Sequence, residues 1–172
     1  MLSRKRETAF LPALVTLIWL LGILIQDPAL AIEPRAGLWS AGAGVGVLGD
    51  TTDGTAFALN LYAERFIDPM VSIGPLVQVA NFKQIALSIQ PKYWIDVTLP
   101  TPNAKMNFQA GLGFIHGGGD TSYVIPLGIG VDYPIDRTYS FTMTLLLNFT
   151  GIDGGLGSGI HLMPGLNLGV RY

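Results

Sequence analysis

The chain contains no cysteine, which excludes disulfide scaffolds, thiolate metal sites and cysteine nucleophiles together. Charged residues are also scarce, at 13%, and the net charge of −2 provides no basic face for nucleic acid. Although 49% of the residues are hydrophobic, no apolar run after residue 31 has the length of a membrane helix. A bundle of membrane helices is therefore excluded. Hydrophobicity this high must instead alternate along the chain, as it does in membrane strands, because only their outer face meets lipid.

The first 31 residues have the order of a secretory signal peptide. A basic patch at Ser3–Arg6 is followed by the apolar run Ala9–Ile25, a breaker at Gln26–Pro28 and small residues that end at Ala31. We predict export by the secretion translocase and cleavage after Ala31, which leaves residues 32–172 as one domain. The alternative is an uncleaved membrane anchor, because the apolar run approaches spanning length.

Segments of about ten residues alternate between apolar and polar positions throughout the rest of the chain. Clusters of Gly, Asp, Pro and Asn separate them, and the 22 glycines are typical of strands in curved barrel walls. The segments lie at about 36–47, 56–64, 71–79, 85–96, 106–114, 122–133, 139–149 and 160–172. They predict an all-β fold, an eight-stranded antiparallel up-and-down transmembrane β-barrel whose narrow lumen is filled by side chains. Because the strand number is even, both chain ends are expected on the periplasmic side.

Aromatic residues on the outward face gather at the two ends of the predicted strands. Those expected at the periplasmic end are Trp39, Tyr93, Phe108, Tyr133, Tyr139 and Tyr172, and those at the external end are Phe57, Phe114, Tyr123 and Phe149. The outward positions between them are aliphatic and carry no charge. Alternation alone would also fit a soluble secreted barrel, but two aromatic girdles on one face are typical of a membrane barrel.

The last eight residues carry a resemblance to a known family. Residues 165–172 alternate apolar side chains and end on an aromatic, with Leu166, Leu168, Val170 and Tyr172 on one face. This segment resembles the C-terminal signature by which the barrel assembly machinery recognises outer-membrane barrels. The whole mature chain is similar to the small eight-stranded outer-membrane barrel proteins, which include the OmpA-type membrane domain. The resemblance implies a monomer integral to the cell outer membrane, in contact with its lipids, and leaves the activity open.

Charged residues predicted to face the lumen cluster near the periplasmic ends of the even strands. They are Glu64, Lys92, Asp96, Asp132 and Arg171. Opposite charges at one level of a narrow lumen should pair, because an isolated buried charge is very costly. One hypothesis is a gate against ions, in which Glu64 and Asp96 face Lys92 and Arg171. The alternative is a polar core that only specifies the barrel.

The external half of the lumen is predicted to be small and neutral. Its inward positions include Ala56, Ala58, Ala80, Ala86, Ser88, Val124 and Met163. This region would hold an acyl chain or a small apolar solute, or it is packed shut. Four prolines inside strands each remove a ladder hydrogen bond, namely Pro75, Pro91, Pro126 and Pro164. They indicate either a lateral opening to the lipid or local bulges that curve the wall.

The two histidines give no strong sign of chemistry. His161 is predicted to face the lumen, with Ser158 and Asp153 nearby in sequence, but no nucleophile motif accompanies this set. His116 is predicted at the outer rim, and no residues have metal-ligand spacing. We therefore expect no enzyme, metal or cofactor, and a structural or passive-permeation role. The alternatives are a narrow channel for small or hydrophobic solutes and a lipid-modifying outer-membrane enzyme.

Overall fold

The computed structural model describes residues 36–51, 53–97, 104–152 and 159–172. The predicted signal peptide lies outside the described residues. The described part contains β1 (Trp39–Thr51), β2 (Gly54–Asp68), β3 (Val71–Ala80), β4 (Gln84–Val97), β5 (Ala104–Ala110), β6 (Leu112–Gly117), β7 (Asp120–Pro134), β8 (Ser140–Thr150) and β9 (His161–Arg171). Within this part, no helix is long and apolar enough to span a membrane.

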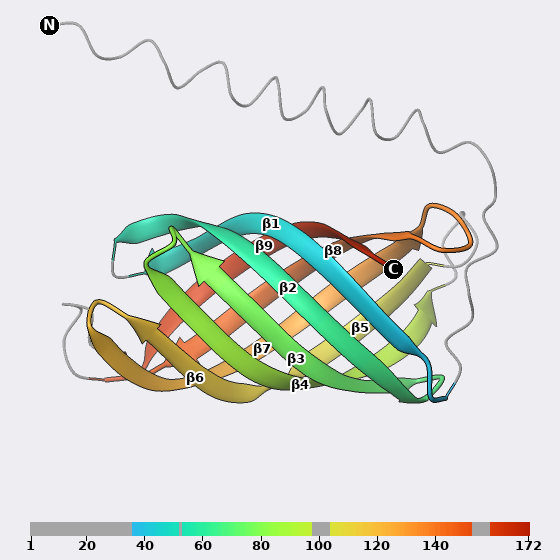
Figure 1. The fold of residues 1–172 in the computed structure, drawn as a ribbon, viewed down its shortest axis with the longest axis horizontal. Coiled ribbons are helices and arrows are strands. Elements are labelled where there is room, and N and C mark those ends of the chain that lie inside the picture. Colours follow the sequence, from blue (N-terminus) through green and yellow to red (C-terminus); the bar gives the residue numbers. More distant parts are fainter. Residues whose placement is uncertain (1–35, 52, 98–103, 153–158) are drawn as a thin grey trace, which may run out of the picture.

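The strands form one closed antiparallel barrel (Figure 1). The wall closes because β1 pairs with β9 as well as with β2. The short elements β5 and β6 lie end to end between β4 and β7, so together they make one strand of the wall. The barrel is therefore eight-stranded, and the predicted fold class is confirmed.

The wall strand formed by β5 and β6 is interrupted at Gly111 because prolines flank it on both sides. Pro91 of β4 and Pro126 of β7 have no N–H to donate toward this strand. Pairing resumes beyond the interruption in the same register on both sides. The Gly111 N–H still donates to the Pro126 carbonyl at 2.8 Å. The interruption is therefore local, and the wall continues past it.

The other two in-strand prolines also leave pairing on one side only. Pro75 pairs with β4 but not with β2, and Pro164 pairs with β8 but not with β1. The described register shifts occur elsewhere, between Leu48 and Thr51 and between Phe66 and Asp68. The register thus runs unchanged past Pro75, Pro91 and Pro126, whereas pairing of β9 with β1 ends at Gly165, next to Pro164. A lateral opening at the prolines stays a prediction.

Both ends of the described chain lie at the same end of the barrel. The backbones of Ala41 and Tyr172 exchange two hydrogen bonds, of 3.0 and 2.8 Å. We call this the terminal end, and the opposite end, with the β3–β4 turn at residues 81–83, the distal end. The terminal end corresponds to the side that the sequence assigns to the periplasm.

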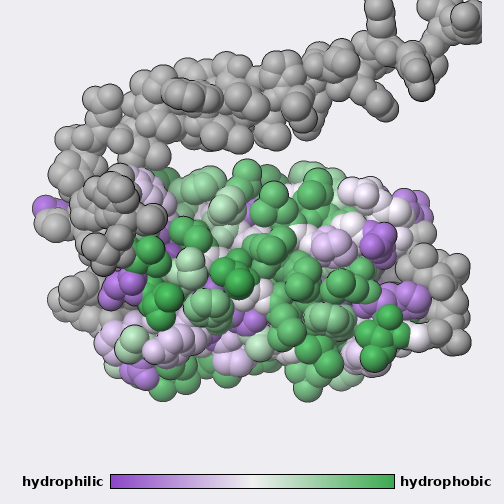
Figure 2. All heavy atoms as spheres, turned by 180° about the vertical axis from the view of Figure 1, so that it is seen from behind, coloured by the Kyte–Doolittle hydropathy of each residue, from purple (hydrophilic) through white to green (hydrophobic). Residues whose placement is uncertain are grey.

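An apolar belt covers the outside of the wall. Its middle carries exposed aliphatic side chains such as Val45, Leu87 and Leu145, each about half exposed. Figure 2 shows hydrophobic residues spread over the middle of one face, with hydrophilic residues toward the ends. Exposed aromatics border the belt: Trp39, Tyr93, Phe108, Tyr139 and Tyr172 toward the terminal end, and Phe57, Phe82, Phe114 and Tyr123 toward the distal end. A belt of this kind on the outside of a protein requires lipid contact.

The narrow barrel brings some backbones so close that only glycine fits between them. A Cβ atom on Gly74 would lie 1.8 Å from the Ala63 carbonyl oxygen and 2.6 Å from the Glu64 Cα. These are backbone atoms of β2, which cannot move aside as the end of a side chain can.

Replacement of Gly74 therefore tests the closeness of β2 and β3. We expect Gly74→Ala to lower the free energy of unfolding by about 3 kcal/mol, because the added methyl group overpacks the wall. Urea titration of the detergent-solubilised barrel measures the change. The control is Gly165→Ala, whose Cβ meets the movable Leu48 Cδ1 at 3.1 Å and should lose less than about 1 kcal/mol. Equal losses in the two variants would contradict the close approach.

Candidate functional site in the barrel lumen

Four of the predicted lumen charges meet at one level inside the barrel. The Lys92 Nζ lies 3.1 Å from Glu64 Oε2, and the Arg171 Nε lies 2.6 Å from Asp132 Oδ2. The Arg171 Nη1 also lies 3.6 Å from Glu64 Oε1 and so joins the two pairs. The side chains of Glu64 and Asp132 are only 2% and 5% exposed. We call these four residues the charged layer, in which two cations compensate two carboxylates.

The barrel topology explains why these four residues meet. Glu64 lies opposite Ser40 on β1, and Lys92 lies opposite Ser72 on β3. Asp132 and Arg171 reach the same level from β7 and β9, which are separated only by β8. Residues far apart in sequence are thus placed around one narrow lumen, and each points inward because strand side chains alternate between the two faces.

Aromatic rings and one hydroxyl group complete the charged layer. Arg171 lies 4.7 Å from the centre of the Trp94 ring, and Lys92 lies 4.4 Å from the centre of the Tyr62 ring. The Trp94 Nε1–H donates to Ser72 Oγ at 2.8 Å, and the Ser72 hydroxyl donates to Glu64 Oε2 at 2.9 Å. These cation–π contacts and hydrogen bonds stabilise charges that are shielded from water.

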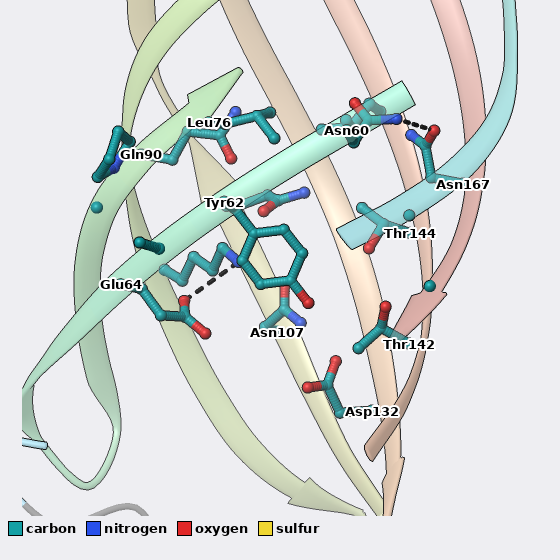
Figure 3. Close-up of a pocket in the computed structure, with 18 of the residues that line it drawn as sticks. Asn60, Tyr62, Glu64, Leu76, Gln90, Asn107, Asp132, Thr142, Thr144 and Asn167 are labelled. Carbon is teal, nitrogen blue, oxygen red and sulfur yellow. Dashed lines mark hydrogen bonds and ion pairs between the residues drawn. The ribbon is translucent and has the colours of Figure 1, made fainter. Parts of the chain in front are cut away.

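Tyr62 occupies the space next to the charged layer because a glycine faces it. Figure 3 shows its ring in the lumen, among Glu64, Asn107 and Thr142. Its cross-strand neighbour is Gly42, where a Cβ atom would lie 2.3 Å from the ring. The Gly-rich sequence of β1 therefore makes room for a large side chain that crosses the lumen.

Asp96 is placed apart from the charged layer. Its carboxylate pairs instead with Lys105, with Nζ 2.5 Å from Oδ1, and its side chain is 82% exposed. Asp96 and Lys105 lie directly opposite each other on β4 and β5, beyond Trp94 toward the terminal end. The expectation that Asp96 faces Lys92 and Arg171 is thus not met, because a closer cation that the sequence analysis overlooked lies on the adjacent strand.

A layer of amide side chains follows on the distal side of the charged layer. It contains the buried residues Asn60, Gln90, Asn107, Gln109 and Asn167, while the buried amides of Gln78 and Asn148 lie opposite Ala86 and Met163. Asn60 donates a hydrogen bond to Asn167 across the lumen (Figure 3). A cavity of about 40 Å³ lies here, lined by amides together with Tyr62, Glu64 and Lys92. We call it the central cavity.

The distal half of the lumen is packed mainly with small and apolar side chains, among which the polar Gln84, Ser88 and Asn148 are also buried. Ala56, Ala58, Ala80, Ala86, Val124 and Met163, all expected there, cluster with Leu48, Ile115 and Ile152. Ile152 follows β8 and is 1% exposed, so it folds back into the barrel. We call these nine residues the distal cluster. Of the two possibilities raised by the sequence, a packed lumen describes this region.

The terminal end of the lumen is more open than the packed distal half. A pocket of about 260 Å³ lies at this end, lined by residues that include Trp39, Ser40, Phe66, Arg137 and Arg171. We call it the vestibule. Arg171 and Phe66 line the vestibule, whereas Glu64, Lys92, Asp132 and Trp94 line the central cavity. The charged layer and its rings therefore separate the two spaces.

The histidines do not form a described catalytic or metal site. His161 begins β9 and lies opposite Thr150, while Ser158 and Asp153 lie outside the described residues. His116 is exposed at the distal rim, with Nδ1 2.8 Å from Thr121 Oγ1. Among the described residues, no group of three or more His, Asp or Glu side chains is arranged to hold a metal ion.

Sequence reasoning overlooked several residues of the lumen. Trp94 and Phe66 are 2% and 3% exposed, and both have the inward parity of their strands. This parity identifies them as lumen residues, but the sequence analysis considered only the aromatic residues of the outward face. The amide side chains, by contrast, follow from the alternation of the sequence, which gives all of them inward parity. The pairing of Lys105 with Asp96 also follows from the hairpin register, which the sequence alone does not determine.

Comparison with known proteins agrees with this architecture. A de novo designed transmembrane β-barrel superimposes with a TM-score of 0.54 at 13% identity, covering 82% of this chain and 98% of the designed one. The crystal structure of neisserial surface protein A (NspA) superimposes with a TM-score of 0.56 at 18% identity, covering 77% of this chain and 94% of NspA. No protein-family model and no curated protein matches the sequence.

This chain folds as a transmembrane β-barrel. The closed eight-stranded wall, the apolar belt and the two structural neighbours agree on that assignment. At these identities the likeness concerns the fold alone. The fold therefore places the charged layer inside a membrane-spanning wall and leaves its role to be argued from its geometry.

Removal of one charge of an ion pair should show how much charge compensation in the lumen stabilises the barrel. We expect Lys92→Met to lower the free energy of unfolding by about 3 kcal/mol, because it leaves Glu64 buried with fewer compensating contacts. Urea titration in detergent measures this loss. In the matched control Lys105→Met, the partner carboxylate of Asp96 is exposed to water, so the loss should stay below about 1 kcal/mol.

The double variant Glu64→Gln/Lys92→Met separates pairing from packing. It should be more stable than the sum of the two single losses predicts, because both members of the pair are neutralised together. Strict additivity would mean that the two charges do not interact.

Proposed function

We propose that this protein is a structural, non-enzymatic component of the outer membrane whose lumen is closed at rest. The observation that carries this proposal is the filling of the lumen by the charged layer, the amide layer and the distal cluster in succession. The described members of the distal cluster are each at most 6% exposed. An outer-membrane location is supported by the fold shared with NspA and by the expected signal peptide.

The central cavity is too small to serve as a pore. Its volume of about 40 Å³ accommodates only a few water molecules. A permeating ion would have to pass the charged layer on one side and the distal cluster on the other. The first passage separates buried ion pairs, and the second requires an ion to enter an apolar region, which is costly. Two successive barriers favour a closed barrel over an open channel.

Assembly and membrane contact belong to the same proposal. The C-terminal residues Leu166, Val170 and Tyr172 point outward and are exposed along β9, which is the wall strand that closes the barrel against β1. This arrangement suits recognition of β9 by the barrel assembly machinery before closure. Lipids of the outer membrane would then cover the apolar belt.

A narrow channel is the second candidate, and the vestibule favours it. The vestibule and the central cavity are separated only by the charged layer and its aromatic rings. If the distal cluster moved aside, this layer would become the remaining barrier and would act as a gate. In that case changes to Lys92 should alter the passage of ions.

Planar bilayer recordings distinguish the two candidates. We expect the wild-type protein and Lys92→Ala to show no discrete conductance steps, because the distal cluster closes the lumen in both. Lys105→Ala serves as a control that removes a cation from the same end without touching the charged layer. Conductance steps in the wild type that change in Lys92→Ala, but not in Lys105→Ala, would contradict the closed barrel and favour the gated channel.

A further inference from the structure

One cation lies on the outside of the barrel, where lipid is expected. Arg65 belongs to β2 and is exposed. Its cross-strand neighbours are Trp39 on β1 and Ile73 on β3. Those two side chains are 67% and 39% exposed on the outer face. Arg65 therefore lies in the terminal-end aromatic girdle, just where the apolar belt ends.

Arg65 has no carboxylate within ion-pair distance among the described residues, and of the other described cations only Arg137, in the turn between β7 and β8, shares this property. Lys83 pairs with Asp53, Lys105 with Asp96, and the two lumen cations with the acids of the charged layer. Glu64, the residue before Arg65, points into the lumen and pairs with Lys92 and Arg171. Asp68, three residues after Arg65, accepts a hydrogen bond from the Met70 N–H at 2.7 Å. Within the described residues, no carboxylate lies within ion-pair distance of Arg65.

A guanidinium in this position, without a carboxylate of the protein beside it, is available to pair with an anion from the surroundings. It lies at the level where a membrane changes from hydrocarbon to headgroups, as the neighbouring Trp39 indicates. An arginine there extends its aliphatic stem along the apolar surface and keeps its charged group among the headgroups. Phosphate is the anion present at that depth, and the planar guanidinium binds phosphate through two parallel hydrogen bonds.

We propose that Arg65 and Trp39 form a binding site for the headgroup of an anionic phospholipid at the terminal end of the barrel. Arg65 pairs with the phosphate, and the indole of Trp39 packs at the boundary between headgroup and acyl chain. Arg65 lies on the outer face of the wall and Trp39 also borders the vestibule, so the site sits at the outer rim of the terminal end. It also fixes the depth of the terminal end in the membrane.

Quenching of Trp39 fluorescence by brominated lipids tests this site. The full chain carries three tryptophans. Trp19 lies in the predicted signal peptide, so the mature barrel keeps Trp39, which is exposed, and Trp94, which is buried in the lumen. The barrel is reconstituted in phosphatidylcholine vesicles that contain an equal small fraction of brominated phosphatidylglycerol or brominated phosphatidylcholine. We expect phosphatidylglycerol to be enriched about fivefold around Trp39 at low salt, which corresponds to one arginine near an anionic headgroup.

Three variants and one competitor decide the outcome. Arg65→Gln should abolish the enrichment, and Lys83→Gln at the distal end should leave it unchanged. Arg65→Lys should retain only part of it, because the charge remains but the two parallel hydrogen bonds of the guanidinium are lost. Equal quenching by the two lipids in the wild type, or undiminished enrichment in Arg65→Gln, would overturn the proposal. Loss of the enrichment on addition of inorganic phosphate, beyond the effect of sodium chloride at equal ionic strength, would show a site for free anions and would also overturn it.

Discussion

Closure of the hydrogen-bonded wall is the constraint on which the rest of this structure depends. In a lipid environment an unpaired backbone group has no water to bind, so a sheet can span a membrane only without free edges. Pairing of β1 with β9 meets this requirement. Pro75, Pro91 and Pro126 interrupt the pairing only over two positions and leave the register unchanged, whereas pairing of β9 with β1 ends at Gly165, next to Pro164. The wall therefore tolerates these prolines, because long paired stretches of strand surround them.

Closure with only eight strands determines what the lumen contains. A barrel this narrow is filled by side chains, so every inward position becomes part of a core. Small residues such as Gly42 and Ala58 leave space for large ones such as Tyr62 and Met163. Charges that enter this core must compensate one another, as Glu64 and Asp132 do with Lys92 and Arg171. Ion pairs and hydrogen bonds then close the polar half of the lumen, and close packing of side chains closes the apolar half.

The alternation of the sequence was enough to predict the fold and the facing of most residues. It placed Glu64, Lys92, Asp132 and Arg171 in the lumen because parity and strand direction are local properties. It could not place Asp96, whose partner Lys105 depends on the register between β4 and β5. The alternation could not predict the interruption at Gly111 either, because this interruption arises from prolines on the two neighbouring strands. The folding of Ile152 into the lumen depends on tertiary packing, which no periodic pattern records.

The central claim, that this chain spans a membrane as a closed barrel, is tested most directly by heat-modifiable migration on a denaturing gel. A folded membrane barrel resists unfolding by detergent alone, so samples of the membrane fraction should migrate differently before and after boiling. The account predicts such a shift, together with extraction from the membrane only by detergent. Identical migration of both samples, with the protein recovered in the aqueous fraction without detergent, would contradict it.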